Sequence, residues 1–230
     1  YLNALGSTLD KEMHIMWTGN SVVDMIGKDD MNWVNTRIKR NAYIWLNYPV
    51  TDYCIDHMLM GPTYGNDLDI AEQLSGFVSN PMEYAEASKV SLYSIADYCW
   101  NMEAYDSQAS WEQALQVLMP EHVEAFRIFC QHNVDLGPTG HGLRRQGESA
   151  EFKAAAESFN ASLAEGYNAK AVKAMTTQFS AMVKAADELL NATEEPEMIA
   201  EIAPWLEVMK IIGQRGETMM GLYNLLNKND

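Results

Sequence analysis

The fold is decided by AYIWLNYP, residues 42–49, a short apolar run that ends in polar residues. Two other runs have the same form, HIMWTG at residues 14–19 and LSGFVSNP at residues 74–81. Short apolar runs that alternate with helical segments are typical of strands in a buried parallel sheet. The three runs therefore predict a parallel sheet in an α/β architecture.

Residues 29–40, between the first two runs, have helical spacing with Met31, Val34 and Ile38 on one face. Acidic residues open this segment and basic residues close it, as the helix dipole favours. After the third run, Pro81 is suited to the first turn of a long helix. Three further helices are therefore expected, at residues 81–100, 111–118 and 121–133.

The best boundary in the chain is DLGPTGHG, residues 135–142, because it is rich in residues that break helices and strands. Beyond it the strand signals end and helical spacing returns, which favours a small antiparallel bundle. The expected helices of this bundle lie at residues 151–165, 169–191 and 197–228. The sequence therefore predicts two domains, residues 1–143 and residues 144–230.

Three strands are too few to close an eight-stranded parallel barrel, and a sheet of three would expose both of its edges. The first domain is therefore expected to need neighbouring strands. An upstream segment of the same protein would supply them without another chain. The sequence also begins at Tyr1 within a stretch that reads as a helix, YLNAL.

Charge and hydropathy exclude two classes of partner. The 32 acidic side chains outnumber the 16 basic ones, and the net charge of -16 would repel a nucleic-acid backbone. No run of about 18 apolar residues occurs, so no membrane span is expected.

The cysteines and histidines do not form a recognisable metal site or disulfide framework. Cys54, Cys99 and Cys130 are odd in number and lack CxxC spacing, so we expect them to be small buried hydrophobic residues. The five histidines lack HxxxH spacing. No metal ion and no cofactor are therefore expected.

Polar and aromatic side chains follow each predicted strand. Thr18 follows the first, Trp45 and Asn47 end the second with Asp52 in the next loop, and Asn80 ends the third. Ligands of parallel α/β folds bind at the carboxyl ends of strands. Carboxamides and a carboxylate that bond hydroxyls, beside indoles that stack on sugar faces, favour a carbohydrate site. The alternative is that the asparagines cap loops and the tryptophans fill the core.

Four blocks of the sequence stand out together: IMWTG at residues 15–19 with Val22-Val23 after it, IWLNYPVTDY at 44–53, GPTY at 61–64 and GFVSNPM at 76–82. They resemble consecutive blocks of glycoside hydrolase family 84, in the same order and with the same spacing. The resemblance covers roughly the first 140 residues, and the helical remainder is similar to the domain that follows the barrel in bacterial members.

The resemblance implies the C-terminal sector of a (β/α)8 TIM barrel followed by an all-α helical bundle. It also implies a β-N-acetylglucosaminidase of the O-GlcNAcase type, which removes terminal β-linked N-acetylglucosamine from a glycan or glycoprotein. Members of this kind use substrate-assisted retaining catalysis through an oxazoline, an exception to the two-carboxylate scheme. Since bacterial members tend to be exported, a periplasmic or secreted location is expected.

The resemblance further implies a set of substrate-binding residues. Asp52 matches a family position that holds sugar hydroxyls. Asn47 and Asn80 match positions that line the pocket, and Trp45 matches a position in its wall. Thr18 and Val22 match positions near the aglycone side and the acetamide.

The catalytic aspartate pair of the family lies upstream of these blocks. The sequence does contain Asp29-Asp30, but this pair follows Gly27-Lys28 rather than an apolar strand, and capping of a helix explains its position. The chain is therefore expected to carry no catalytic residue and to be an incomplete, inactive portion of the enzyme. The alternative is a non-catalytic carbohydrate-binding or scaffold protein with a helical protein-interaction module.

Overall fold

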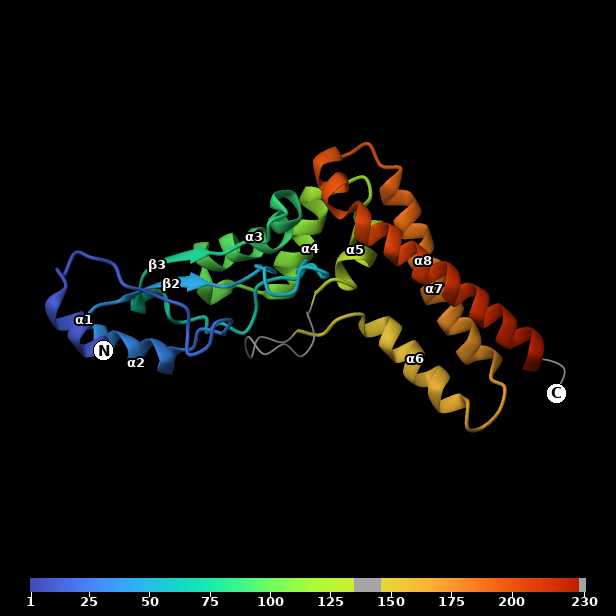
Figure 1. Ribbon diagram of the computed structural model, residues 1–230, viewed down its shortest axis with the longest axis horizontal. Coiled ribbons are helices and arrows are strands. Elements are labelled where there is room, and N and C mark those ends of the chain that lie inside the picture. Colours follow the sequence, from blue (N-terminus) through green and yellow to red (C-terminus); the bar gives the residue numbers. More distant parts are fainter. Residues whose placement is uncertain (135–145, 228–230) are drawn as a thin grey trace. The chain divides into compact units, whose positions relative to one another are not determined.

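The computed structural model describes residues 1–134 and 146–227, which form two compact units. The first unit holds a parallel sheet with the strand order β1-β2-β3. Figure 1 labels its strands β2 and β3. Its strands are β1 (Met16–Trp17), β2 (Ala42–Leu46) and β3 (Leu74–Ser79). The parallel sheet predicted from the three apolar runs is confirmed.

Helices connect and cover these strands. Because Ala42, Ile44 and Leu46 of β2 are buried while Tyr43 and Trp45 are partly exposed, one face of the sheet forms the core. The helices of this unit are α1 (Leu2–Thr8), α2 (Lys28–Ile38), α3 (Ala85–Trp100) and the first part of α4 (Ser107–Leu118), with short 3-10 turns η1 (Ala71–Gln73) and η2 (Met102–Ala104).

The helix α2 has the charge arrangement that the sequence predicts. Asp29 and Asp30 lie in its first turn and Arg37 in its last, which suits the helix dipole. Neither aspartate caps the helix with its side chain, because the cap position belongs to Gly27. The Asp30 carboxylate instead accepts a hydrogen bond from the side chain of Asn20 at 2.5 Å. The capping role predicted for the pair is therefore wrong, although its place at a helix start is confirmed.

The helix α3 begins four residues later than predicted. Pro81 is not in its first turn, and Tyr84 still has an extended backbone. Met82 explains the delay, since its side chain is 4% exposed and its sulfur accepts the Leu59 N–H at 3.3 Å. Because Met82 packs against the loop that contains Leu59, the residues directly after β3 are not helical, and α3 begins only at Ala85.

The connection from β2 to β3 contains no α-helix, and buried side chains hold it in place. Met58 and Met60 are fully buried. The Tyr48 hydroxyl donates to the Gly61 carbonyl at 2.7 Å, and the Ser91 hydroxyl lies 2.7 Å from the same oxygen. Hydrogen bonds from the end of β2 and from α3 therefore fix this connection.

The second unit is helical, as predicted. Its central helix is α7, on which α5, α6 and α8 all pack. None of the described helices is long and apolar enough to cross a membrane. The helices of this unit are α5 (Val123–Gln131), α6 (Ala150–Ser162), α7 (Ala169–Leu190) and α8 (Pro196–Asn227).

The division of the chain differs from the predicted one at residues 115–133, which include the end of α4 and all of α5. The predicted boundary between residues 143 and 144, and the segment 135–142 that suggested it, lie outside the described residues. Residues 115–133 group with the helical unit, not with the sheet. Within that unit His122 contacts Glu188 of α7 through its Nδ1 at 2.9 Å, so α5 is attached to the bundle by its polar residues as well.

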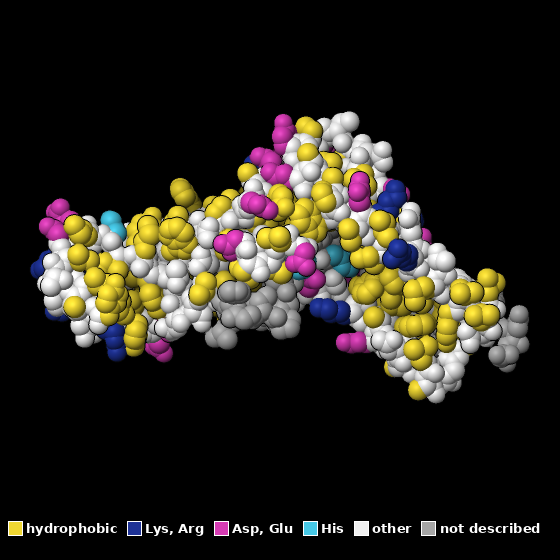
Figure 2. Space-filling view, in the orientation of Figure 1, with side chains coloured by type: hydrophobic (Ala, Val, Ile, Leu, Met, Phe, Trp, Pro, Cys, Tyr) yellow, Lys and Arg dark blue, Asp and Glu magenta, His cyan; other side chains and the backbone are white. Residues whose placement is uncertain are grey.

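Glycines in α8 allow it to lie close to α7. A Cβ atom at Gly213 would be 2.8 Å from the backbone oxygen of Phe179, and one at Gly216 would be 2.2 Å from the Phe179 ring. Hydrophobic side chains also lie on the visible surface of the helical unit (Figure 2). The exposed apolar residues of α8 include Val208, Ile211, Ile212, Met219, Leu222, Leu225 and Leu226.

The cysteines differ in environment, contrary to the prediction that all three are buried. Cys130 is buried in α5, whereas Cys54 is half-buried and Cys99 is exposed. Cys99 lies in the last turn of α3. The prediction was therefore right for one cysteine of three.

We expect Gly213→Ala to lower the free energy of unfolding of the helical unit by about 1 to 3 kcal/mol, because the added methyl group would force α7 and α8 apart. Chemical denaturation followed by circular dichroism measures this change. Gly221→Ala is the matched control, because a Cβ atom there meets nothing within 4 Å. This control should stabilise α8 by about 0.5 to 1 kcal/mol. Equal effects of the two substitutions would contradict close packing at Gly213.

Candidate functional site

The carboxamide of Asn47 links the carboxyl ends of all three strands. Its Oδ1 accepts hydrogen bonds from Trp45 Nε1 at 2.9 Å and from Asn80 Nδ2 at 3.1 Å. Its Nδ2 donates to the carbonyl of Val22, in the loop after β1, at 2.6 Å. Four of the six predicted site residues are thus joined by direct hydrogen bonds.

The bonding capacity of Asn47 is largely used within the chain. A carboxamide oxygen has two lone pairs, and both are occupied here. One N–H of its Nδ2 is engaged as well, which leaves a single donor. Asn47 is therefore built mainly to hold its neighbours in place.

Asn80 is fixed by its backbone and keeps its side-chain oxygen available. Its N–H donates to the Leu46 carbonyl and its own carbonyl accepts from Val50 N, both at 2.9 Å. Within residues 1–134 and 146–227, the Asn80 Oδ1 has no hydrogen-bond partner. Asn80 therefore presents a free acceptor at a fixed position.

The Trp45 indole is anchored at its edge and open on its surface. Its N–H is held by Asn47, and the side chain is 39% exposed. It projects from the face of β2 opposite the buried residues Ile44 and Leu46. An indole held in this way can stack on an apolar sugar face at little cost in conformational freedom. The core-filling alternative does not apply to Trp45.

Asp52 and Thr18 stand apart from this network. Asp52 is exposed, and its carboxylate has no partner among the residues that the structure describes. The Thr18 hydroxyl is 3.5 Å from the Ser21 carbonyl, in the loop after β1. Neither residue shares a hydrogen bond with Asn47, so the structure brings four of the predicted residues together and leaves two as separate groups.

Sequence reasoning missed one buried residue next to this site. The Asp24 carboxylate is in the loop after β1 and accepts backbone N–H groups of Asn20, Ser21 and Met25. The only signal in the sequence was Gly19 five residues earlier, whose positive φ of 103° brings the backbone against Asp24. A buried aspartate is unusual enough to need an explanation.

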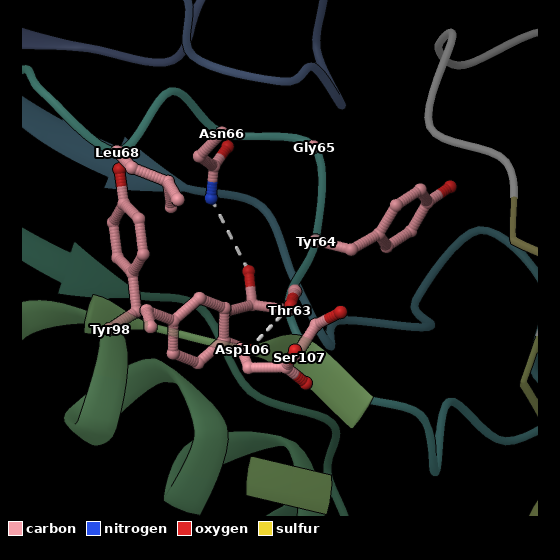
Figure 3. Close-up of a pocket in the computed structure, with 9 residues that line it drawn as sticks. Thr63, Tyr64, Gly65, Asn66, Leu68, Tyr98, Asp106 and Ser107 are labelled. Atoms are coloured by element: carbon pink, nitrogen blue, oxygen red, sulfur yellow. Dashed lines mark hydrogen bonds between the residues drawn. The ribbon is translucent and has the colours of Figure 1, made fainter. Parts of the chain in front are cut away.

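A separate pocket of about 300 Å³ lies beside the loop of residues 63–68, and Figure 3 shows its lining. The Tyr98 hydroxyl donates to the Asp67 carbonyl, and the Tyr105 hydroxyl to the Thr63 carbonyl, each at 2.6 Å. Burial raises the pKa of Tyr98, which keeps this phenol protonated as a donor. Because the Tyr98 and Tyr105 hydroxyls are engaged in holding the loop, we assign this pocket to loop support.

The chemistry of the site depends on neutral and acidic hydrogen-bonding groups. Among the described residues, no three His, Cys, Asp or Glu side chains gather closely enough to hold a metal ion. Trp45, Asn47, Asp52 and Asn80 instead offer an aromatic surface, carboxamides and a carboxylate. Such a set is suited to a neutral polyhydroxylated ligand.

Sequence families identify the class to which this fold and site belong. Residues 1–131 match the family described as beta-N-acetylglucosaminidase. Residues 148–230 match the family described as the post-catalytic domain of bacterial GH84. The chain therefore belongs to glycoside hydrolase family 84.

Individual relatives agree with this assignment. The rat and mouse proteins named Protein O-GlcNAcase are each 30% identical to the chain over 99 residues, which is 43% of this chain and 11% of each relative. The chain spans about a tenth of the length of these relatives. The region that matches these relatives is less than half of this chain.

Solved structures of the same family match nearly the whole chain. The structure titled CpGH84B has a TM-score of 0.86 and 30% identity over 99% of this chain and 40% of its own. A mutant of the Thermobaculum terrenum O-GlcNAc hydrolase has a TM-score of 0.85 and 27% identity, over 96% of this chain and 46% of its own. The predicted fold class, a C-terminal barrel sector followed by a helical bundle, is confirmed.

We expect Asn47→Ala to lower the stability of the sheet unit by about 1 to 3 kcal/mol, because it leaves the Trp45, Asn80 and Val22 groups without their partner. Thermal denaturation of the protein that carries this chain measures the loss. Asp52→Ala should leave the melting temperature unchanged, since its carboxylate has no partner to lose among the described residues. If both substitutions were neutral, the bridging role of Asn47 would be wrong.

Proposed function

We propose that this chain is the sugar-binding, C-terminal part of a β-N-acetylglucosaminidase of the O-GlcNAcase type. The observation that carries the proposal is the Asn47 network, which arranges Trp45, Asn80 and the loop after β1 at the carboxyl ends of a parallel sheet. Ligands of such folds bind at this end. The names of the relatives, protein O-GlcNAcase and O-GlcNAc hydrolase, support the same substrate class.

The proposed reaction is substrate-assisted and retains the anomeric configuration. The acetamide oxygen of the sugar attacks the anomeric carbon as the glycosidic bond breaks, and a general acid protonates the leaving oxygen. Water then opens the resulting oxazoline. An aspartate pair performs the proton transfers, and we propose that a segment upstream of this chain supplies it, because Asp29 and Asp30 lie in the first turn of α2 and the Asp30 carboxylate accepts the Asn20 side chain.

Within this scheme the described residues bind the sugar and leave the proton transfers to other groups. Asp52 has a carboxylate free to accept hydrogen bonds from a pair of sugar hydroxyls, and Asn80 Oδ1 can accept one more. Trp45 offers its ring as a wall. Val22 and Thr18 lie in the loop after β1, which we assign to the acetamide and aglycone side.

The proposed substrate is a glycan or glycoprotein that ends in β-linked N-acetylglucosamine. We propose a periplasmic or secreted location by resemblance to bacterial members of the family.

We expect the 230-residue chain alone not to hydrolyse aryl N-acetylglucosaminides, whereas the protein that also carries the upstream segment should do so. A fluorogenic aryl N-acetylglucosaminide measures both activities. Turnover by the chain alone that is abolished in Asp29→Ala or Asp30→Ala would contradict the assignment of these aspartates to α2. A longer protein that binds an N-acetylglucosamine-like inhibitor without turnover would favour the alternative, a non-catalytic carbohydrate-binding protein.

In the active longer protein, Asp52→Ala should lower kcat/KM by the equivalent of about 2 to 4 kcal/mol, because it removes charge-assisted hydrogen bonds to the sugar. Asn80→Ala should cost about 0.5 to 1.5 kcal/mol, since it removes neutral hydrogen bonds. Asp56→Ala is the matched control, because Asp56 is another exposed carboxylate in the same connection. Wild-type kinetics for Asp52→Ala would show that Asp52 is only a surface carboxylate.

A further inference from the structure

The loop after β1 is organised around one buried carboxylate. Asp24 is only 8% exposed. Its Oδ2 accepts the backbone N–H groups of Asn20 at 2.7 Å and Ser21 at 3.0 Å, and its Oδ1 is 2.9 Å from Met25 N. A buried carboxylate that accepts several N–H groups forms charge-assisted bonds, which are about twice as strong as neutral ones. Asp24 therefore fixes the backbone at Asn20 and Ser21, before Val22, and at Met25, after it.

Close packing reinforces this arrangement. Gly19 has a φ of 103°, and a Cβ atom there would lie 2.6 Å from the Cβ of Asp24. The loop thus has no space for a side chain at this position. In addition, the Asn20 side chain donates to Asp30 of α2 at 2.5 Å. The loop is therefore held by its own carboxylate and by the start of the next helix.

The residue that this loop presents is Val22. It lies between Ser21 and Asp24 in the sequence, and its side chain is 59% exposed. Its carbonyl accepts the side-chain N–H of Asn47 at 2.6 Å. Asp24 thus sets the position of Val22 from one side, and Asn47 sets it from the other.

We infer that Asp24 is a positioning residue of the sugar site, which holds Val22 in place for the N-acyl group of the substrate. Asp24 does not itself contact the sugar, because its carboxylate is buried and directed at backbone N–H groups. This inference rests on the proposed function. It adds a residue that acts on selectivity through the backbone of its own loop.

The test uses the longer, active protein with the substitution Asp24→Asn. Asparagine keeps the size of the side chain but turns an N–H group toward the N–H groups of Asn20 and Ser21 if its oxygen stays at Met25. We expect kcat/KM for an aryl N-acetylglucosaminide to fall about ten-fold, which corresponds to the loss of one charged hydrogen bond. The ratio of kcat/KM between N-acetyl and N-propionyl substrates should also change, because Val22 moves relative to the acyl group.

Asp106→Asn is the matched control. The Asp106 carboxylate also accepts a backbone N–H, that of Ala109 at 2.8 Å, but it does so at the start of α4. This substitution should leave the ratio between the two substrates unchanged. A general loss of stability would lower turnover of both substrates alike, so the ratio separates positioning from a purely structural role.

Three outcomes would overturn the inference. If the unaltered protein is active but Asp24→Asn leaves the substrate ratio unchanged, the inference about Asp24 is wrong while the proposed function stands. If Asp24→Asn does not fold, Asp24→Ser, which keeps one acceptor, carries the same test. Failure of both variants to fold would show that the carboxylate serves the fold and not the site. Absence of turnover by the unaltered longer protein would overturn the proposed function as well.

Discussion

The Asn47 carboxamide is the interaction on which the arrangement of this site depends. The strand ladders end at Trp17 of β1, Leu46 of β2 and Ser79 of β3. Beyond them, Asn80 N–H donates to the Leu46 carbonyl and Val50 N–H donates to the Asn80 carbonyl, which continues the pairing of β2 and β3 by two backbone hydrogen bonds. Asn47 extends the connection by bonding one group from each strand end, through Trp45, Asn80 and Val22. Loops tied together in this way hold their side chains in one geometry before a ligand arrives, which lowers the cost of binding.

A second set of hydrogen bonds supports Asn47 from the core. Tyr48 follows it in the sequence and is 2% exposed, with its hydroxyl on the Gly61 carbonyl. The Ser79 hydroxyl donates to the Tyr48 carbonyl at 2.7 Å. Adjacent residues at the end of an extended strand point in opposite directions. Asn47 therefore faces the site while Tyr48 anchors the same backbone in the core.

The sequence was sufficient to predict the parallel sheet and the helices of the second unit, because both depend on local hydrophobic spacing. It placed the start of α3 too early, since the burial of Met82 depends on the loop that contains Leu59, more than 20 residues away. It also assigned α5 to the sheet domain, because spacing along a helix does not say which partner it packs on. The same limit explains Asp24, whose burial depends on the backbone conformation around Gly19.

Five of the six candidate site residues were found from their place after the predicted strands and Val22 through the resemblance, but their separate tasks follow from counting hydrogen bonds. Asn47 has used nearly all of its bonding capacity within the chain, so its main effect on a ligand is exerted through the residues it holds. Asn80 keeps one acceptor free, and the whole carboxylate of Asp52 has no partner among the described residues. A carboxylate in water loses solvation when a ligand covers it, so it contributes to binding only if the ligand returns equivalent hydrogen bonds. A pair of sugar hydroxyls does so, whereas an apolar ligand would not, and we therefore propose that Asp52 gives the candidate site its preference for a hydroxylated ligand.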